Sequence, residues 1–498
     1  MGFLDGLMTV FQIHNLVLLI LGVVLGIIVG AIPGLTATLA ISLLLPFTFS
    51  LEASTALIML IGIYVGGIYG GSITAILLRT PGTPAAAATS LDGYPLMQKG
   101  QGGRALGIAT SASFIGGQIS CIFLIFLSPL ISNFAIKFSS AEYFALAIFG
   151  LTIIFSVSGK YLLKGVIAGL IGLVINTVGF DVIVAYPRFT FGVRSLMIGF
   201  PLLPAIIGLF ALSELLRLFK AGVDDDDAIH DNVGRILPRW PDLRQLKWVL
   251  LKSSLIGTFI GALPGAGANI ASFVAYSECK RTSKTPELFG KGIIEGVAAS
   301  ESANNAVTGG ALIPMLTLGV PGDAVTAVLL GALTIQGLQP GPLLFRNNPG
   351  IINSIFASTI VGNIVMLLTG LFLAKAIAKI AIMKKTTLIP IIAIFSMIGA
   401  YAAESSLAHM KIAVIFGIAG YILEQMDFPL APIALSIVLG SLAENSFRAA
   451  LIRSGGDWRI FFHSAISVVF LAIAAASVFF ALRNQYKASK ESQGGASL

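Results

Sequence analysis

Long apolar segments recur along the whole chain, and short polar connections separate them. They cover residues 16–32, 56–78, 105–130, 144–155, 165–178, 201–218, 249–263, 351–374, 388–403, 412–423, 431–442 and 460–482. A helix that crosses the hydrocarbon core of a bilayer needs about 20 apolar residues. The pattern therefore predicts an all-α polytopic membrane protein with roughly 11 transmembrane helices, together with segments too short or too broken to cross cleanly.

The composition supports this prediction. Of the 498 residues, 56% are hydrophobic and only 11% are charged, and the mean hydropathy is +0.93. Soluble domains carry roughly 25% charged residues. This chain therefore has too few charged residues to form the water-exposed surface of an ordinary soluble protein. The first 15 residues contain no Lys or Arg, so the basic region of a cleavable signal peptide is missing.

The net charge of +8 reflects Lys and Arg residues in the connections between apolar segments. This distribution is typical of cytoplasmic loops and does not indicate nucleic-acid binding. Cys121 and Cys279 lie far apart, and the four His residues are scattered. We therefore expect no cofactor, and no metal beyond a possible Na⁺ ion.

A polar connector at residues 221–248 divides the chain nearly in half. It contains the run Asp224–Asp227 and several Lys and Arg residues. We predict a first transmembrane repeat at 1–220, a cytoplasmic connector at 221–248 and a second transmembrane repeat at 249–498.

Sequence motifs recur in the two halves in the same order. GAIPGLTATLA begins at Gly30 and GALPGAGANIA at Gly261, while GGSITAILLRTPGTPAA begins at Gly70 and GGALIPMLTLGVPGDAV at Gly309. The order and approximate spacing favour a duplicated unit. The connection at 50–52 has no Lys or Arg, whereas its counterpart at 280–291 has four, which predicts two inverted repeats.

The same charge rule predicts the topology. The N-terminus lies outside and the C-terminus in the cytoplasm, with Lys99, Lys284 and Lys384 all inside. Three arginines at 448, 453 and 459 fall outside on this path, which counts against it.

Four Pro-Gly pairs interrupt the apolar segments. Pro lacks a backbone N–H and Gly permits unusual backbone angles, so each pair ends a helix inside the membrane and forms a hairpin. The freed backbone groups must line a protein interior or a watery cavity, where helix N-termini face anions. The predicted substrate-binding residues are Pro33, Gly34, Thr36, Arg79, Thr80, Pro81, Gly82, Thr83, Pro264, Gly265 and Asn269. Pro and Gly also serve as kinks and packing points, and Arg79 could instead anchor a helix at the interface.

A polar face is predicted near residue 300. Glu301, Asn304, Asn305 and Thr308 occupy positions i, i+3, i+4 and i+7 of one helix. We predict a cation site from Asn304, Asn305, Thr308 and Asp323, with Na⁺ or H⁺ as the ion. The alternative is that the Asn residues join neighbouring helices and Glu301 lies near the aqueous end.

These motifs resemble the large membrane subunit of the tripartite tricarboxylate transporters. The resemblance rests on GAIPGLTATLA, YGGSITAILLRTPGTPAA, GALPGAGANIASFVAY and SESANNAVTGGALIPMLTLGVPGDAV, and it runs from about Gly30 to the last apolar segment. It implies a permease of the bacterial inner membrane that acts with a small four-helix membrane subunit and a periplasmic solute-binding protein. It also implies ion-driven uptake of citrate or a related tri-, di- or monocarboxylate.

The leading functional hypothesis is therefore a secondary transporter rather than an enzyme. An intramembrane enzyme for a lipid-linked substrate is the main alternative, but it would show clustered catalytic carboxylates or His residues. A passive channel is a third possibility, although the duplicated helix breaks favour alternating access.

Overall fold

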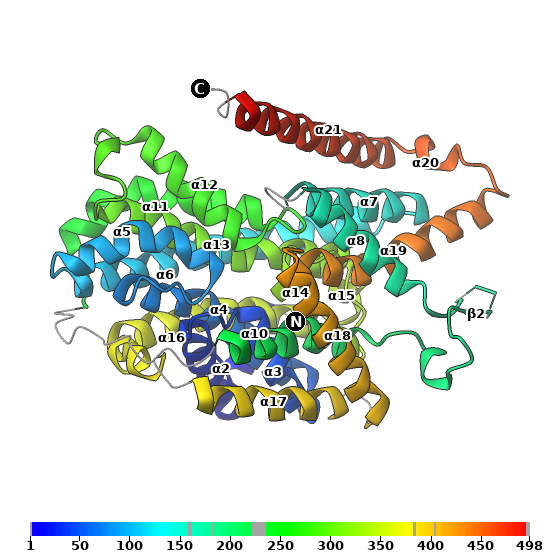
Figure 1. The fold of residues 1–498 in the computed structure, drawn as a ribbon, viewed down its shortest axis with the longest axis horizontal. Helices are drawn as coiled ribbons and strands as arrows, with labels where there is room; N and C mark the ends of the chain where they lie inside the picture. The colour runs from blue at the N-terminus through cyan, green and yellow to red at the C-terminus, as the bar shows by residue number, and fades with distance from the viewer. Residues whose placement is uncertain are drawn as a thin grey trace.

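The computed structural model describes residues 2–157, 162–181, 183–184, 186–221, 236–381, 385–402 and 405–494, which are mainly helical (Figure 1). The α-helices before the connector are α1 (Phe3–Phe11), α2 (Ile13–Ala31), α3 (Ala37–Leu44), α4 (Ala53–Leu77), α5 (Ala87–Gln98), α6 (Gly102–Ala135), α7 (Ser140–Val157), α8 (Leu162–Asn176), α9 (Leu202–Ile206) and α10 (Ser213–Ala221). Those after it are α11 (Trp240–Gly261), α12 (Gly267–Thr282), α13 (Ile294–Leu318), α14 (Ala324–Ile335), α15 (Pro342–Asn347), α16 (Pro349–Ala381), α17 (Lys385–Ala402), α18 (Leu407–Gln425), α19 (Leu430–Arg453), α20 (Ile460–His463) and α21 (Ala465–Gly494).

Short elements complete the described chain. The 3₁₀ turns are η1 (Leu45–Thr48), η2 (Pro84–Ala86), η4 (Arg194–Leu196) and η6 (Pro286–Leu288), and a π-helical stretch η5 (Ile207–Leu212) joins α9 to α10. Strands β1 (Gly179–Phe180) and β2 (Pro187–Arg188) form an antiparallel pair.

Seven helical stretches of the described chain are long and apolar enough to cross a membrane. They are 13–31, 53–77, 102–135, 202–220, 349–380, 407–425 and 430–453, and further apolar helices have 10–17 residues. The prediction of an all-α polytopic membrane protein is confirmed. The count of about 11 spans and the inverted relation of the halves stay predictions.

Two central helices, α4 and α13, are buried along nearly their whole length. Helix α2 packs along α4, and α11 packs along α13. Gly22, Gly26 and Gly30 on α2 face the backbone of α4, and Gly257 and Gly261 on α11 face the backbone of α13. Small residues allow such close approach of helices, so each half uses glycine for the same kind of contact.

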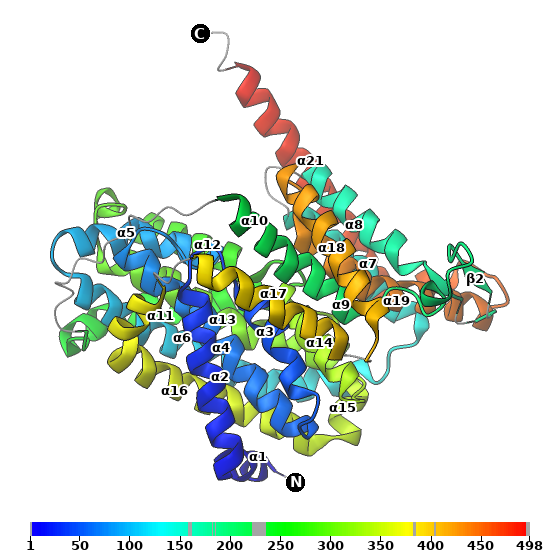
Figure 2. The same cartoon turned by 60° about the horizontal axis from the view of Figure 1, so that its bottom comes forward.

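The remaining helices surround this centre. Helices α5, α6, α11 and α12 lie at one end of the molecule, and α7, α8 and α19 lie at the other (Figures 1 and 2). Helices α3, α10, α14 and α17 lie between these groups in Figure 2. Helix α21 packs against α7 and then extends away from the body.

Most of the predicted connector and Lys384 lie outside the described residues. Helix α11 begins at Trp240, which falls within the predicted connector. Pro241 occupies its first turn, where the missing N–H costs no helical hydrogen bond.

Two connections predicted to be cytoplasmic contact each other. Lys99 after α5 donates from Nζ to the carbonyl oxygen of Lys291, at 2.5 Å. The carboxylate of Asp92 on α5 accepts the backbone N–H groups of Gly290, Gly292 and Ile293. The connections after α5 and before α13 therefore lie on the same side of any membrane.

Paired charges connect the segment that follows α8 with helix α19. Asp181 binds Arg448, and Arg188 binds Glu444. The hydrogen bond from Arg448 holds the pKa of the Asp181 carboxyl well below its usual range. The positive-inside rule counts Lys and Arg residues whether or not an acid lies beside them, so Arg448 still counts against the predicted topology.

We expect Lys99→Cys and Lys284→Cys to resist an impermeant thiol reagent added from outside, in a background without Cys121 and Cys279. Arg194→Cys, in the exposed η4 turn, should react because the predicted path places that turn outside. Labelling of intact cells measures the difference. Equal labelling of the Lys284 and Arg194 variants would contradict the topology.

Candidate functional site

Two adjoining cavities are lined by residues of the Pro-Gly breaks. The first, here called the break cavity, has a volume of about 450 Å³. Its lining includes Thr36–Thr38, Thr83–Ala85, Gly265–Asn269 and Asp323–Val325, so all four breaks contribute through the residues that follow them. The sequence thus predicted correctly which segments would meet, although they are up to about 290 residues apart.

Helix N-termini point at the break cavity. Helices α3, α12 and α14 begin there, and η2 leads from it into α5. The N-terminus of a helix has free N–H groups and a partial positive charge, so it attracts anions. The cavity is therefore suited to a negatively charged group even without a neighbouring lysine.

The four N-termini differ in how they are capped. The Thr36 hydroxyl accepts from the Leu39 N–H at 3.2 Å, and Asp323 Oδ1 accepts from the Thr326 N–H at 2.7 Å. Neither η2, α5 nor α12 has a side-chain cap. The buried Thr83 hydroxyl beside η2 has no hydrogen-bond partner. The N-terminus of α12 thus keeps donors available for an anion, whereas at η2 Pro84 has no N–H and the Ala86 N–H donates to the Thr83 carbonyl oxygen.

Glycine is required at the breaks themselves. Gly34 and Gly265 have φ values of +90° and +79°, which side chains rarely allow. A Cβ atom at Gly82 would collide with the Gly30 carbonyl oxygen, and one at Gly322 would lie 2.6 Å from the Gly261 carbonyl oxygen. Gly82 and Gly322 thus make corresponding contacts in the two halves.

The second cavity, here called the arginine cavity, has a volume of about 550 Å³. It is lined by Pro33, Gly34, Thr36, Pro81, Gly82, Pro84, Glu214, Arg217, Leu218 and Glu424. Arg217 donates from Nε to Glu214 Oε2 at 2.7 Å and from Nη2 to Oε1 at 2.5 Å. The side chain of Arg217 is 45% exposed, so its remaining donors are accessible to a ligand.

Asp323 has a structural role within the break cavity. It caps α14, and its Oδ2 accepts from the Tyr64 hydroxyl at 2.9 Å. The residue is only 7% exposed. Both carboxylate oxygens therefore have partners, while the residue still lines the cavity.

The polar face of α13 is buried against α5 and α6. Glu301 accepts from the Thr89 hydroxyl at 2.5 Å and from the Ser113 hydroxyl at 2.9 Å. Asn305 donates to the Ser113 hydroxyl at 2.8 Å. Glu301 is 0% exposed, so protein atoms and not water surround its carboxyl group.

The other predicted residues lie in several places. Asn304 donates to the Ile68 carbonyl oxygen at 3.3 Å, and Thr308 donates to the Asn305 carbonyl oxygen at 2.7 Å. The guanidinium of Arg79 lies 5.8 Å from the centre of the Tyr94 ring, outside the lining of both cavities. Thr80 and Pro264 adjoin breaks but are also outside both linings.

Sequence reasoning missed the polar residues that α10 and α18 contribute. Arg217 and Glu214 end an apolar segment just before the connector, so they read as loop or interface residues. Glu424 follows another apolar segment in the same way, and it lines both cavities. The spacing of Glu214 and Arg217, an acid and a cation one helical turn apart, is the sequence signal that could have pointed to them.

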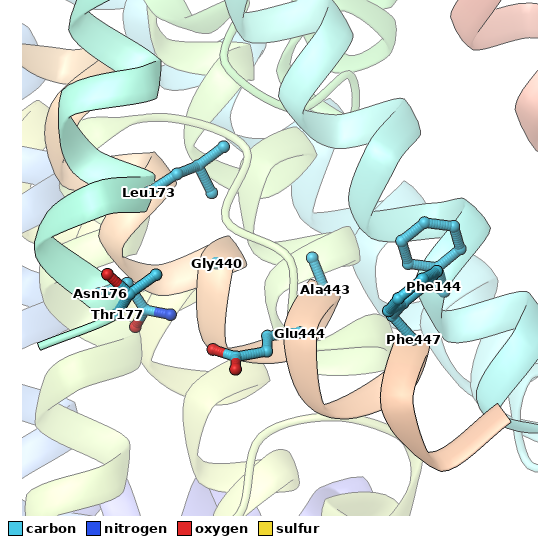
Figure 3. A pocket seen from close by; sticks show the side chains of 8 residues that line it. All are labelled: Phe144, Leu173, Asn176, Thr177, Gly440, Ala443, Glu444 and Phe447. Atoms are coloured by element: carbon cyan, nitrogen blue, oxygen red, sulfur yellow. The ribbon is translucent and has the colours of Figure 1, made fainter. Parts of the chain in front are cut away.

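A further cavity of about 360 Å³ lies between α7, α8 and α19 (Figure 3). Leu173 and Asn176 come from α8, Thr177 follows directly after it, and Gly440, Ala443, Glu444 and Phe447 come from α19, with Phe144 of α7 beside Phe447. Its polar side chains are engaged, because Glu444 binds Arg188 and Asn176 accepts from Ser441. This cavity therefore offers fewer free groups to a polar ligand than the break cavity does.

The described chain is a multi-pass helical membrane protein whose interrupted helices meet at an internal polar cavity, and this architecture is that of a transporter. Residues 16–435 match the tripartite tricarboxylate transporter TctA family, so the chain belongs to that family. The resemblance seen in the sequence motifs is thereby confirmed.

Two relatives come from Agrobacterium vitis. One, described as an uncharacterized 52.8 kDa protein in the TAR-I ttuC' 3' region, is 37% identical over 457 residues, 91% of this chain and 90% of the relative. The other, an uncharacterized protein in the TAR-II ttuC' 3' region, is 37% identical over 235 residues, 47% of this chain and 97% of the relative. No solved structure matches the chain.

Proposed function

We propose that this chain is the permease subunit of a binding-protein-dependent secondary transporter that imports small carboxylates. The observation that carries the proposal is the convergence of four helix N-termini on the break cavity, next to the arginine cavity. The substrate class is a tricarboxylate such as citrate, or a related di- or monocarboxylate.

The donor set fits a carboxylate. A substrate with two or three carboxylates loses much of its hydration inside an apolar protein, so each charge must be compensated. The N–H groups at the start of α12, the hydroxyl of Thr83 and the guanidinium of Arg217 can compensate these charges. Arg is suited to this role because its planar group can hold a carboxylate with two hydrogen bonds.

A co-transported cation would balance the remaining charge. We propose a Na⁺ or H⁺ gradient as the driving force, with Asn304, Asn305, Thr308 and Asp323 as ligands for the cation. In support, Asn304 Oδ1 and Asn305 Oδ1 are buried acceptors without a hydrogen-bond partner. Hard cations such as Na⁺ favour oxygen ligands of this kind.

Replacing Asp323 with Asn is expected to weaken the cation dependence of uptake more than it weakens delivery by the binding protein. The variant removes a charge but keeps a side-chain oxygen that can cap α14, at a cost of about 1 kcal/mol or less. Uptake measured over a range of cation concentrations checks this. An unchanged cation requirement would leave Asp323 only as the cap of α14.

The expected partners are a small four-helix membrane subunit and a periplasmic solute-binding protein. We propose the bacterial inner membrane as the location, with the N-terminus outside and the C-terminus in the cytoplasm. This assignment rests on family membership and on the charge distribution of the connections.

Reconstitution into proteoliposomes tests the proposal. Uptake of labelled citrate, a dicarboxylate and a monocarboxylate is measured with each partner added or omitted, under imposed Na⁺ or pH gradients. We expect gradient-driven accumulation that requires all three components. The substrate recovered from the vesicles should be chemically unchanged. A chemically altered substrate would instead favour an intramembrane enzyme, and uptake without any gradient dependence would favour a channel.

A further inference from the structure

Glu424 lies in the last turn of α18, where that helix packs beside α10 (Figure 2). Gly420, one turn earlier, allows close contact, because a Cβ atom placed there would lie 3.2 Å from the Ser213 Cβ atom. Beyond Glu424, Lys220 on α10 donates from Nζ to Gln425 Oε1 at 2.7 Å. These two contacts bracket Glu424 and place its side chain beside the first two turns of α10.

Glu424 lines both the break cavity and the arginine cavity. Thr36 and Pro84 also line both, so Glu424 is the one charged residue common to the two described linings. Its Oε2 atom is buried without a hydrogen-bond partner, and no ion pair with a described residue engages the side chain. Because the residue is only half-buried and Arg217 attracts it electrostatically, we expect its carboxylate to present a negative charge to the cavities.

The other charged side chains of the two described linings have bonded partners. Glu214 and Arg217 form an ion pair with a distance of 2.5 Å between Oε1 and Nη2. Asp323 accepts from the Thr326 N–H, and its negative charge offsets the positive end of α14. Glu424 is therefore the acid in these linings whose charge is not already matched by a hydrogen bond or an ion pair.

The positive potential that remains for a substrate is limited. The N-termini of α3 and α12 contribute roughly half a charge each. Arg217 offers free hydrogen-bond donors, but Glu214 already offsets its charge. Two carboxylates of a substrate can be matched by these groups. A third carboxylate finds no further positive group in the described linings, and Glu424 repels it.

We propose that Glu424 limits the charge of the transported substrate, so that the cavities favour a carboxylate with two negative charges over one with three. This inference rests on the proposed function and narrows its substrate class. Glu424 acts by repulsion, and proteins commonly discriminate between ligands by contacts that are unfavourable to one of them. If Glu424 instead accepts a hydrogen bond from a substrate hydroxyl, or binds the cation, the test below gives a different result.

Glutarate and tricarballylate are a matched pair of substrates, because tricarballylate is glutarate with one more carboxylate on its central carbon. Citrate is tricarballylate with a hydroxyl group on that carbon. Uptake of each labelled acid is measured with the complete system in proteoliposomes, at a pH at which all the carboxyl groups of the acids are ionised. The same binding protein delivers the substrate to every variant, so its own selectivity cancels when variants are compared.

We expect Glu424→Gln to lower the ratio of kcat/KM for glutarate to kcat/KM for tricarballylate by about tenfold, because the repulsion of the third carboxylate is removed. Glu424→Asp keeps the charge and should keep the wild-type ratio. Asp427→Asn is the matched control, since Asp427 is exposed, pairs with Lys164 and lies outside both linings. Its φ value of +58° is one that Asn tolerates.

Three outcomes would overturn the role of Glu424. The first is an unchanged ratio in Glu424→Gln. The second is a larger loss of tricarballylate than of glutarate uptake, which a cation-binding role predicts. The third is a loss confined to citrate, which a hydroxyl acceptor predicts.

Thermal unfolding of the purified full chain supplies a readout without the binding protein, since a ligand that binds the folded state raises the Tm. We expect glutarate to raise the Tm of the wild type more than tricarballylate does, and Glu424→Gln to reduce this difference. The wild-type comparison keeps the test valid if Glu424→Gln fails to fold, and a larger rise with tricarballylate would overturn the role of Glu424. A wild type that transports none of the three acids would refute the proposed function instead.

Discussion

Leucine in place of Gly34 or Gly265 is expected to abolish carboxylate uptake while membrane insertion is largely retained. Both glycines have positive φ values that a leucine rarely adopts. At Gly34 a Cβ atom would also lie 2.7 Å from Arg217 Nη2 and 2.9 Å from Glu214 Oε1. Leucine thus disturbs both the break and the ion pair beside it, and uptake of labelled citrate by the complete system measures the loss.

Gly100→Leu is the matched control for this experiment. Gly100 has a φ value of +72°, and no atom lies within 4 Å of a Cβ atom placed there. The variant therefore carries a similar backbone strain outside both cavities, and we expect it to retain uptake. Normal uptake by Gly34→Leu or Gly265→Leu would show that the corresponding break does not form the site.

Arg217→Gln is expected to raise the apparent KM for citrate by about tenfold or more. The reason is that a hydrogen bond to a charged group contributes about 1.5–3 kcal/mol. A monocarboxylate should be affected less, since it has fewer charges to compensate. Uptake rates over a range of substrate concentrations provide the comparison.

Two further variants test which arginine side chains act on the substrate. Arg217→Gln leaves Glu214 without its partner, so the double variant Glu214→Gln/Arg217→Gln removes both charges together. If the double variant restores a normal KM, Arg217 only neutralises Glu214. Arg79→Gln tests the sequence-based prediction for that residue, namely a larger effect on tricarboxylate than on monocarboxylate uptake, although its guanidinium lies outside the lining of both cavities. Equal effects on both substrates would assign Arg79 to the membrane interface.

The site was only partly accessible to sequence reasoning. The Pro-Gly pairs were found because they interrupt apolar segments in which an unbroken helix is expected. Arg217 and Glu424 were missed because a charged residue at the end of an apolar segment normally lies at the membrane interface. Only the packing of α10 and α18 places these side chains at the cavities.

The sequence by itself determined the membrane class, the helical fold, the family and the four breaks. The class, the fold and the breaks follow from local chemistry, namely the length of apolar segments and the backbone properties of Pro and Gly. The family follows from the resemblance of the motifs and their order. The tertiary structure decided which breaks have capped helix N-termini and which keep free donors. It also separated two acids that the sequence left similar, since Asp323 lines the break cavity as a helix cap and Glu301 is enclosed by hydroxyl groups. Such differences depend on contacts between residues far apart in the chain, as between Thr89 and Glu301, and helical periodicity carries no information about them.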